Sequence, residues 1–512
     1  MTDNAGSAYV VPLSSVTLAD IGRVGGKNAS LGEMLHALQQ QGVRVPDGFV
    51  LTADAFRLHL REANLTEWIE QTLARVDVRD VRALAEAGQS IRARVREAPI
   101  PKALIPAVTE AYAELSRRYG DAATDVAVRS SATAEDLPGA SFAGQHETYL
   151  NIRGMAALDP AIRACFASLF TDRAIVYRTE HGFAHRDVAL SVGVQKMVRS
   201  DLGSAGVIFT LDTESGFRDV VLITGAWGIA ESLVQGRVAP DEFWIHKPTL
   251  RAGFRSILRR ERGTKAVKLV YAESGLRTVR EVRVPEADRL RFVLTDDELL
   301  TLARWSLAIE EHYSAVAGRP TPMDIEWARD GQSGDLFIVQ ARPETVHAGR
   351  AGARLELFRR QGPGRVLLTG KSVGQRVGTG AVRLVHGPEE LPLVQAGEVL
   401  VTRMTDPDWE PVLQRVAAVV TDEGGRTCHA AIVSRELGIP CVVGTGTATS
   451  TLATGALVTV SCAEGDEGRV YEGKVEFTRE ELDPATAPRS PVPLMLNVGN
   501  PDHAFALAQL PS

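Results

Sequence analysis

The sequence predicts a multidomain protein of the α/β and α+β classes, and three observations carry this prediction. Its 512 residues exceed the length of one ordinary domain. Helical and strand-like patterns alternate from residue 1 to about residue 345. A strand, a glycine turn, a helix and a second strand then follow one another within residues 417–446.

The individual elements follow from residue type and spacing. Segments rich in β-branched residues predict strands over 188–198 and 219–228, and helical spacing predicts helices over 31–40 and 161–170. A stretch rich in Gly and Arg, 346–365, predicts a linker with a short helix. A stretch rich in Pro and acidic residues predicts a second linker over 476–493. The predicted folded parts are therefore residues 1–345, 366–475 and 494–512.

Composition and charge exclude several classes of protein. The net charge of -7 argues against a nucleic-acid binder. We expect no signal peptide and no membrane span, because the N-terminus lacks a basic start and no run of about 18 apolar residues occurs. The four cysteines are scattered and form no C-x-x-C pair, which predicts a cytoplasmic protein.

The segment 417–446 places His429 in the first turn of its predicted helix. A neutral imidazole is a nucleophile at pH 7, and a helix N-terminus can hold the phosphoryl group that it acquires. Thr427 can add a hydroxyl donor or cap the helix. A single histidine at such a position more often has no chemical role, so the interpretation depends on the whole motif.

Two upstream segments carry candidate phosphate ligands. Lys27 follows two glycines before a predicted helix in VGGKNASLGEM, which is typical of a phosphate clamp although it is not a Walker A loop. Arg129 ends a predicted strand in VAVRSSATAEDLPGASFAGQHET and can pair with phosphate oxygens. The small-residue loop that follows, with Gly139 and Gly144, can close over a triphosphate.

A predicted hairpin over 322–345 carries candidate metal ligands. Asp324 and Glu326 are two residues apart on its first strand, so their side chains share one face. Gln340 and Arg342 share a face of the second strand. Two carboxylates and an amide oxygen are ligands for Mg²⁺, and the arginine can stabilise a transferring phosphoryl group. A solvated polar face is the commoner explanation for any one such pair.

The motif GGRTCHAAIVSRELGIPCVVG resembles the phosphohistidine signature of phosphoenolpyruvate synthases and related dikinases. Its Thr-Cys-His order is more similar to the synthases than to pyruvate phosphate dikinases. The upstream segments resemble the ATP-grasp domain that precedes the phosphohistidine domain in the same family. The resemblance covers nearly the whole chain and implies an ATP-grasp domain followed by a swivelling β/α phosphohistidine domain.

The resemblance also implies roles for individual residues. Lys27 and Arg129 would bind the phosphates of ATP, and Arg342 would lie at the phosphoryl groups being transferred. Mg²⁺ would lie at Asp324, Glu326 and Gln340. The remaining residues implied in nucleotide binding are a strand at the adenine (Gln195, Lys196, Met197 and Val198) and two further contacts, Glu231 and Gln235.

The family converts ATP, pyruvate and water to AMP, phosphoenolpyruvate and phosphate through the phosphorylated histidine. Residues 494–512 resemble only the start of the family's pyruvate-binding barrel. We therefore expect an incomplete chain that phosphorylates His429 but lacks the pyruvate site. Its expected partners are ATP, a separate barrel-containing chain and a second copy of itself.

Three alternatives remain open. The first is a phosphotransferase with another small-molecule acceptor, as in rifampicin phosphotransferases. The second is a dikinase that uses phosphate instead of water. The third is a relic that only holds nucleotide.

Overall fold

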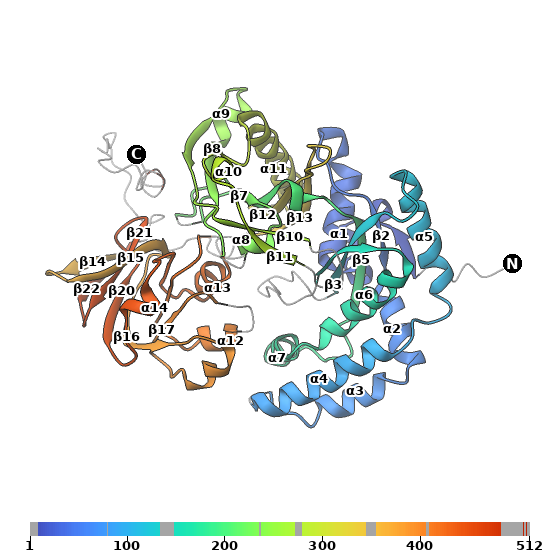
Figure 1. Cartoon of the computed structure of the whole chain (residues 1–512), viewed down its shortest axis with the longest axis horizontal. Helices are drawn as coiled ribbons and strands as arrows, with labels where there is room; N and C mark the ends of the chain where they lie inside the picture. The colour runs from blue at the N-terminus through green and yellow to red at the C-terminus, as the bar shows by residue number, and fades with distance from the viewer. Residues whose placement is uncertain are drawn as a thin grey trace. The chain divides into compact units, whose positions relative to one another are not determined.

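The computed structural model divides into two compact units (Figure 1). The first comprises Met1–Arg199, Tyr271–Arg280 and Ile325–Arg342; the second comprises Ser200–Val270, Glu281–Asp324 and Pro343–Ser512. The residues that the structure describes are 9–78, 80–133, 148–213, 215–234, 237–271, 279–344, 355–405, 409–426, 428–482, 505 and 508.

The first unit contains a five-stranded antiparallel sheet in the order β1-β2-β5-β3-β4. Its strands are β1 (Val10–Pro12), β2 (Gly48–Leu51), β3 (Asp125–Ala132), β4 (Thr148–Arg153) and β5 (Leu190–Lys196). Its helices are α1 (Ile21–Ala37), α2 (Ala53–Glu62), α3 (Thr66–Leu73), α4 (Val81–Glu97), α5 (Ile105–Arg118), α6 (Met155–Ala167) and α7 (Asp172–Glu180).

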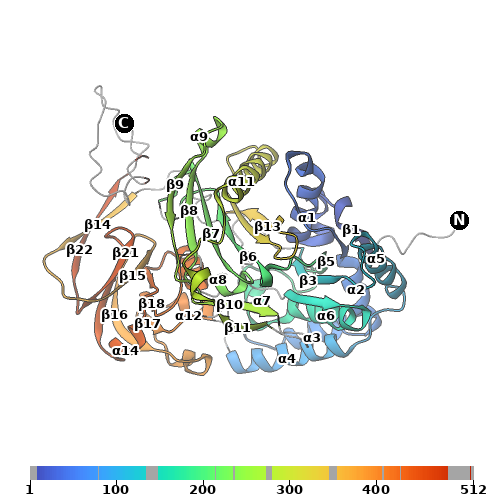
Figure 2. The ribbon, with the colours of Figure 1, turned by 45° about the horizontal axis from the view of Figure 1, so that its top comes forward.

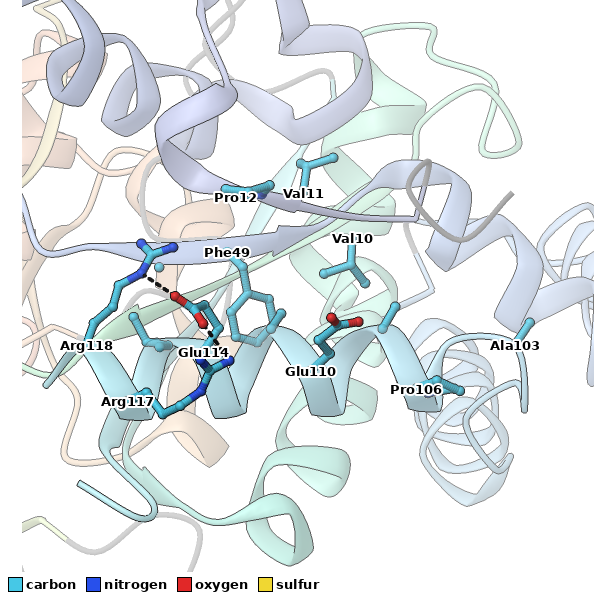
Figure 3. Close-up of a pocket in the computed structure, with 14 residues that line it drawn as sticks. Val10, Val11, Pro12, Phe49, Ala103, Pro106, Glu110, Glu114, Arg117 and Arg118 are labelled. Carbon is cyan, nitrogen blue, oxygen red and sulfur yellow. Dashed lines mark hydrogen bonds and ion pairs between the residues drawn. The ribbon is translucent and has the colours of Figure 1, made fainter. Parts of the chain in front are cut away.

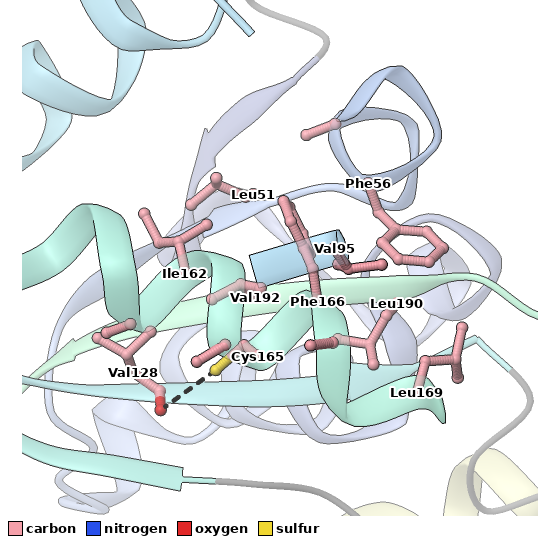
Figure 4. Packing of buried hydrophobic residues seen from close by; sticks show 14 of the residues in the cluster. Leu51, Phe56, Val95, Val128, Ile162, Cys165, Phe166, Leu169, Leu190 and Val192 are labelled. Carbon is pink, nitrogen blue, oxygen red and sulfur yellow. Dashed lines mark hydrogen bonds between the residues drawn. The ribbon is translucent and has the colours of Figure 1, made fainter. Parts of the chain in front are cut away.

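Helices and sheet of this unit share one apolar core (Figure 4). Phe166 of α6 lies 5.4 Å from Phe56 of α2 between ring centroids. The thiol of Cys165 donates to the carbonyl of Val128 on β3, at 3.7 Å. Such packing anchors β3, the strand that carries Arg129, because buried apolar side chains are close-packed and resist displacement.

The second unit contains strands of a six-stranded sheet in the order β13-β12-β6-β7-β8-β9, together with the hairpin β10-β11. Residues 325–342 of the β12–β13 hairpin group with the first unit. The strands are β6 (Ser204–Phe209), β7 (Val220–Trp227), β8 (Asp241–His246), β9 (Ile257–Glu261), β10 (Val267–Tyr271), β11 (Val279–Arg283), β12 (Met323–Arg329) and β13 (Leu336–Pro343). The helices are α8 (Glu231–Val234), α9 (Lys247–Arg251), α10 (Glu286–Arg289) and α11 (Asp296–Ala317).

The second unit also contains a closed barrel, here called the histidine barrel, in the order β15-β19-β18-β17-β16-β20-β21. Strands β16 to β19 run parallel, and the other pairings are antiparallel. The strands are β15 (Val366–Val373), β16 (Val377–Leu384), β17 (Val399–Thr402), β18 (Ala418–Thr421), β19 (Cys441–Val443), β20 (Leu457–Ser461) and β21 (Glu467–Glu472). Its helices are α12 (Glu410–Leu413), α13 (His429–Leu437) and α14 (Ala448–Thr451).

Short 3-10 helices complete the described elements: Leu13–Ser15, Leu18–Asp20, Gln39–Gln41, Ser168–Phe170, Ser200–Leu202 and Pro388–Leu393. Among the residues that the structure describes, no helix combines the length and the apolar character needed to cross a membrane.

Most expected elements are confirmed, with shifted ends. The segments 188–198 and 219–228 contain β5 and β7, and the hairpin is formed by β12 and β13. The helix expected over 31–40 begins ten residues earlier, at Ile21, and ends at Ala37. The helix expected over 161–170 runs from Met155 to Ala167 and is followed by a 3-10 turn.

The short helix expected in the first linker is wrong for the described residues, which form a strand; the two linkers themselves stay a prediction. Within these segments, β14 (Leu355–Gln361) pairs antiparallel with β22 (Glu476–Leu482) (Figure 2). The first strand is basic and the second acidic, and Arg359 lies 3.8 Å from Glu480 between charged atoms. Opposite charges across an antiparallel pair of strands stabilise the pairing. The two segments are far apart in the sequence, so neither one alone predicts that it forms a strand with the other.

Candidate functional site

The sequence around His429 folds as predicted and places this residue at the first position of α13. Strand β18 precedes it, Gly438 ends the helix in the left-handed conformation, and β19 follows. Gly424 lies at φ +116° in the turn between β18 and α13, and a Cβ there would lie 2.9 Å from Sγ of Cys428. The tight turn therefore requires glycine at this position.

The imidazole of His429 is largely enclosed, with 8% of the residue exposed. Its Nδ1 lies 3.2 Å from Oγ1 of Thr405, which follows β17. A hydrogen bond at Nδ1 holds the plane of the ring. The sequence did not predict Thr405, because the residue lies 24 positions upstream in another element.

The residue before the histidine is suited to packing. Cys428 is buried beside the helix residues Ala430 and Ala431 in the same apolar cluster. Burial raises the pKa of the Cys428 thiol, so at neutral pH the thiol stays protonated. Cys428 is therefore a poor nucleophile, and His429 is the better one in this segment.

Two buried arginines, Arg426 and Arg435, contact each other next to the turn that precedes His429, and they were not predicted as site residues. Arg426 forms an ion pair with Asp466, and its backbone carbonyl accepts a hydrogen bond of 3.1 Å from Arg435 of α13. Both arginines are less than a tenth exposed. Arg435 thus ties the last turn of α13 to the turn before His429, and Asp466 compensates the charge of Arg426.

In the first unit, α1 is kinked where the sequence predicted a phosphate clamp. Gly25 has φ +73°, and Lys27 lies in the helical turn after this kink. The backbone amide of Lys27 donates to Oγ of Ser131 on β3, at 3.1 Å. The kink thus brings the start of the second helical part against β3, and the role of Lys27 as a phosphate clamp stays a prediction.

Arg129 brings three of the predicted site residues together. It lies inside β3, which continues to Ala132, so the expectation that it ends the strand is corrected. Its guanidinium donates to Oε1 of Gln340 at 2.8 Å and lies 3.7 Å from Oε2 of Glu326. Arg129 therefore connects β3 to one face of the β12–β13 hairpin.

The predicted metal ligands fit a metal only in part. Asp324 and Glu326 are half-buried on β12, while the alternate residues Met323, Ile325 and Trp327 are fully buried, as predicted for one shared face. Two carboxylates together with substrate phosphates suit Mg²⁺. The amide oxygen of Gln340 instead accepts from Arg129.

No group of three or more His, Cys, Asp and Glu side chains in the described part of the chain is arranged to hold a metal. Asp324 and Glu326 thus fit as two ligands that need oxygens from a bound nucleotide to complete a site. Arg342 lies two residues beyond Gln340 on β13 and is half-buried.

The strand predicted at the adenine is β5 and the residues after it. Gln195 is buried, and its amide nitrogen donates to the carbonyl of Pro46 at 3.1 Å. Lys196 forms an ion pair with Asp125, and Met197 and Val198 are buried. In the antiparallel register Gln195 lies opposite Ala127 and Gly193 opposite Arg129, so Gln195 and Arg129 point to the same face of the sheet.

The remaining predicted residues are not brought to these sites by described contacts. Glu231 begins α8 in the second unit and is exposed. The predictions that lie outside the described residues are Gly139, Gly144, Gln235 and Thr427.

A groove of about 540 Å³ lies elsewhere in the first unit, against β1, β2 and α5 (Figure 3). Its wall combines apolar residues such as Val10 and Phe49 with Glu110, Glu114 and Arg118. None of the predicted site residues lines it.

Two family models match this chain. The family model described as "Pyruvate phosphate dikinase, AMP/ATP-binding domain" matches residues 21–361. The model described as "PEP-utilising enzyme, mobile domain" matches residues 394–465, which include His429.

Several curated proteins are similar over almost the whole chain. Phosphoenolpyruvate synthases of Synechocystis sp., Deinococcus radiodurans and Escherichia coli are 48%, 54% and 50% identical over 99%, 98% and 100% of this chain. The chain spans about three fifths of their length, covering 62%, 62% and 64% respectively.

These comparisons correct one expectation. The similarity to each of these three proteins extends over at least 98% of this chain. They do not support the expectation of an incomplete enzyme that lacks the pyruvate site and is limited to phosphorylating itself.

Proposed function

Since the chain belongs to the pyruvate phosphate dikinase AMP/ATP-binding domain family, we propose that it acts in phosphoenolpyruvate synthesis, with His429 as the phosphoryl carrier. The overall reaction converts ATP, pyruvate and water to AMP, phosphoenolpyruvate and phosphate. The observation that carries the proposal is the position of His429 at the start of α13, with Nδ1 held by Thr405.

The first step is attack by Nε2 of His429 on the β-phosphorus of ATP. The bond from this phosphorus to the oxygen bridging the α-phosphate breaks, and AMP leaves with that electron pair. Water then removes the terminal phosphate from the pyrophosphorylated imidazole. The remaining phosphoryl group passes to the enol oxygen of pyruvate, whose methyl group gives up a proton. Thr405 acts as a positioning residue, because its hydrogen bond at Nδ1 holds the plane of the imidazole ring.

The nucleotide would be bound by the first unit and the β12–β13 hairpin. Lys27 and Arg129 would bind phosphates, and Arg129 would exchange Gln340 and Glu326 for phosphate oxygens. Mg²⁺ held by Asp324 and Glu326 would neutralise charge on the phosphates. Further proposed roles are Arg342 at the transferred group, Thr427 at the phosphohistidine, Gly139 and Gly144 in a closing loop, and Gln195, Lys196, Met197, Val198, Glu231 and Gln235 at the nucleotide.

A carrier that serves a nucleotide and then pyruvate has to reach two acceptors in turn. The histidine barrel has apolar clusters of its own, which supports the proposal that it moves as a body. We infer a swivelling ATP-grasp and phosphohistidine arrangement from this and from the family membership.

The test uses ATP labelled at the β-phosphorus. We expect acid-labile label on the protein, AMP as the nucleotide product, and no label on His429→Ala. His386→Ala is the matched control, because His386 is an exposed histidine of the same barrel and should label normally. Adding pyruvate should move the label into phosphoenolpyruvate.

Each outcome bears on one part of the proposal. A protein that binds ATP without labelling would show a nucleotide-holding relic instead. Label on His429 that pyruvate does not discharge would exclude pyruvate as the acceptor.

A further inference from the structure

Two glutamates face each other across neighbouring strands of the second unit. Glu242 of β8 lies directly opposite Glu261 of β9 in the antiparallel register. Like charges in this position destabilise a sheet. Nζ of Lys371, on β15 of the histidine barrel, lies 2.7 Å from Oε1 of Glu242 and 3.6 Å from Oε2 of Glu261. One barrel lysine therefore compensates a charge repulsion in the sheet.

The same contact continues as a series of ion pairs toward the histidine turn. Glu261 pairs with Arg259 of β9, and Arg259 lies 3.5 Å from Asp466 between charged atoms. Asp466 in turn pairs with Arg426, which is three residues before His429. The series thus connects β8 and β9 to the turn that carries the phosphoryl acceptor.

The start of β8 is itself held firmly. Asp241 and Lys265 form a fully buried ion pair. The other carboxylate oxygen of Asp241 accepts from the backbone amide of Val293 at 2.9 Å. Pro240, just before this strand, lies against Gly425, where an added Cβ would approach the Pro240 ring to 3.2 Å. A rigid strand end therefore presents both Pro240 and Glu242 to the barrel.

We propose that Glu242 and Lys371 are positioning residues, whose ion pair docks the histidine barrel on the start of β8 in a resting position. The inference deepens the proposed function and rests on it, because docking matters only if the barrel moves as a carrier.

The charges suit a reversible contact. Glu242 has a side chain 2% exposed, and its Oε2 has no hydrogen-bond partner within the described part of the chain. The side chain of Lys371 is 37% exposed. When the barrel leaves, water can solvate both charges, which offsets much of the attraction lost.

The experiment places a thiol at the contact and measures its reactivity. Pro240 is buried, and the four native cysteines are buried as well. In the variant Pro240→Cys, a thiol reagent should react only when the barrel undocks. We expect the labelling rate to rise with salt, because the ion pair is screened. Adding Lys371→Met should raise the rate about threefold at low salt and reduce the salt dependence, leaving the part that comes from the contact between Arg259 and Asp466.

A matched control separates docking from general loosening. Arg383→Met removes another barrel cation, which pairs with Glu398 inside the barrel, and should leave the labelling rate unchanged. Glu242→Gln should act like Lys371→Met, and the two together should add little. A rise in the Arg383→Met control equal to that in Lys371→Met would overturn the proposal, as would a labelling rate that does not depend on salt while Lys371 is present.

The readout needs no ATP turnover. Failure of His429 to take up the phosphoryl label from ATP would therefore count against the proposed function and would not affect the docking result. An unchanged rate of thiol modification when Lys371→Met is added to Pro240→Cys would count against docking alone.

Discussion

His429 and Cys428 are neighbours that the fold uses differently. Both are buried in the histidine barrel, but Cys428 packs in an apolar cluster whereas a ring nitrogen of His429 meets a hydroxyl group. Chemistry at this position is thus decided by the partners of each side chain and not by burial alone.

A second histidine, in the first unit, predicts a pH effect on stability. Nδ1 of His185 accepts from Nε of Arg178 at 3.1 Å, and Arg178 is fully buried. Burial and the neighbouring Arg178 lower the pKa of His185 from 6.5 to about 4. The folded protein therefore keeps this imidazole neutral over a pH range in which the unfolded chain binds a proton.

The sign of the effect follows. The stabilising contribution is complete above pH 6.5 and is lost as the pH falls toward 4. Because His185 is partly exposed, we expect a loss of about 1–2 kcal/mol between pH 7 and 4.5. Urea unfolding of His185→Gln should show a smaller loss over that range. The control His386→Gln, at an exposed histidine, should follow the wild type; a His185→Gln curve that also follows it would contradict the prediction.

At the scale of elements, the kink in α1 depends on one glycine. Gly25 has φ +73°, and a Cβ there would lie 2.6 Å from the backbone oxygen of Ser131. Gly25→Ala should lower the free energy of unfolding by about 2–4 kcal/mol, because strain and overlap add. It should also weaken ATP binding, since Lys27 follows the kink. Calorimetric unfolding and titration with ATP measure the two effects.

Gly22→Ala is the matched control in the same helix. A Cβ at Gly22 would meet nothing within 4 Å, and its φ is not positive. This substitution should be neutral or stabilise by about 0.5–1 kcal/mol. An equal loss of unfolding free energy in both variants would show that any substitution in this helix destabilises the protein, and that the kink has no special role.

Elements with a local signature could be predicted from the sequence, and those that depend on distant partners could not. The turn, helix and strand around His429 are encoded within one motif, so α13 begins where expected. Gln340 and Arg129 are 211 positions apart, and only the fold shows that Gln340 serves the arginine. Strand β14 has no clear period of its own and is formed by pairing with the acidic β22.

At the scale of the whole chain, the ion pairs at β8 predict a kinetic effect. His429 is 8% exposed in the structure in which Lys371 and Glu242 are paired, and the proposed function requires this nucleophile to reach ATP. Weakening the contact should increase the fraction of reactive molecules. We expect Lys371→Met to raise the initial rate of labelling from β-labelled ATP about threefold at low salt.

The kinetic comparison includes two internal checks. Wild-type protein at high salt should approach the rate of Lys371→Met, because screening weakens the same pair. Arg383→Met should label at the wild-type rate, since its partner Glu398 lies within the barrel. A slower rate in Lys371→Met would mean that the docked position is the reactive one, and an unchanged rate would mean that docking does not limit phosphorylation. Either result would remove the resting role assigned to this contact.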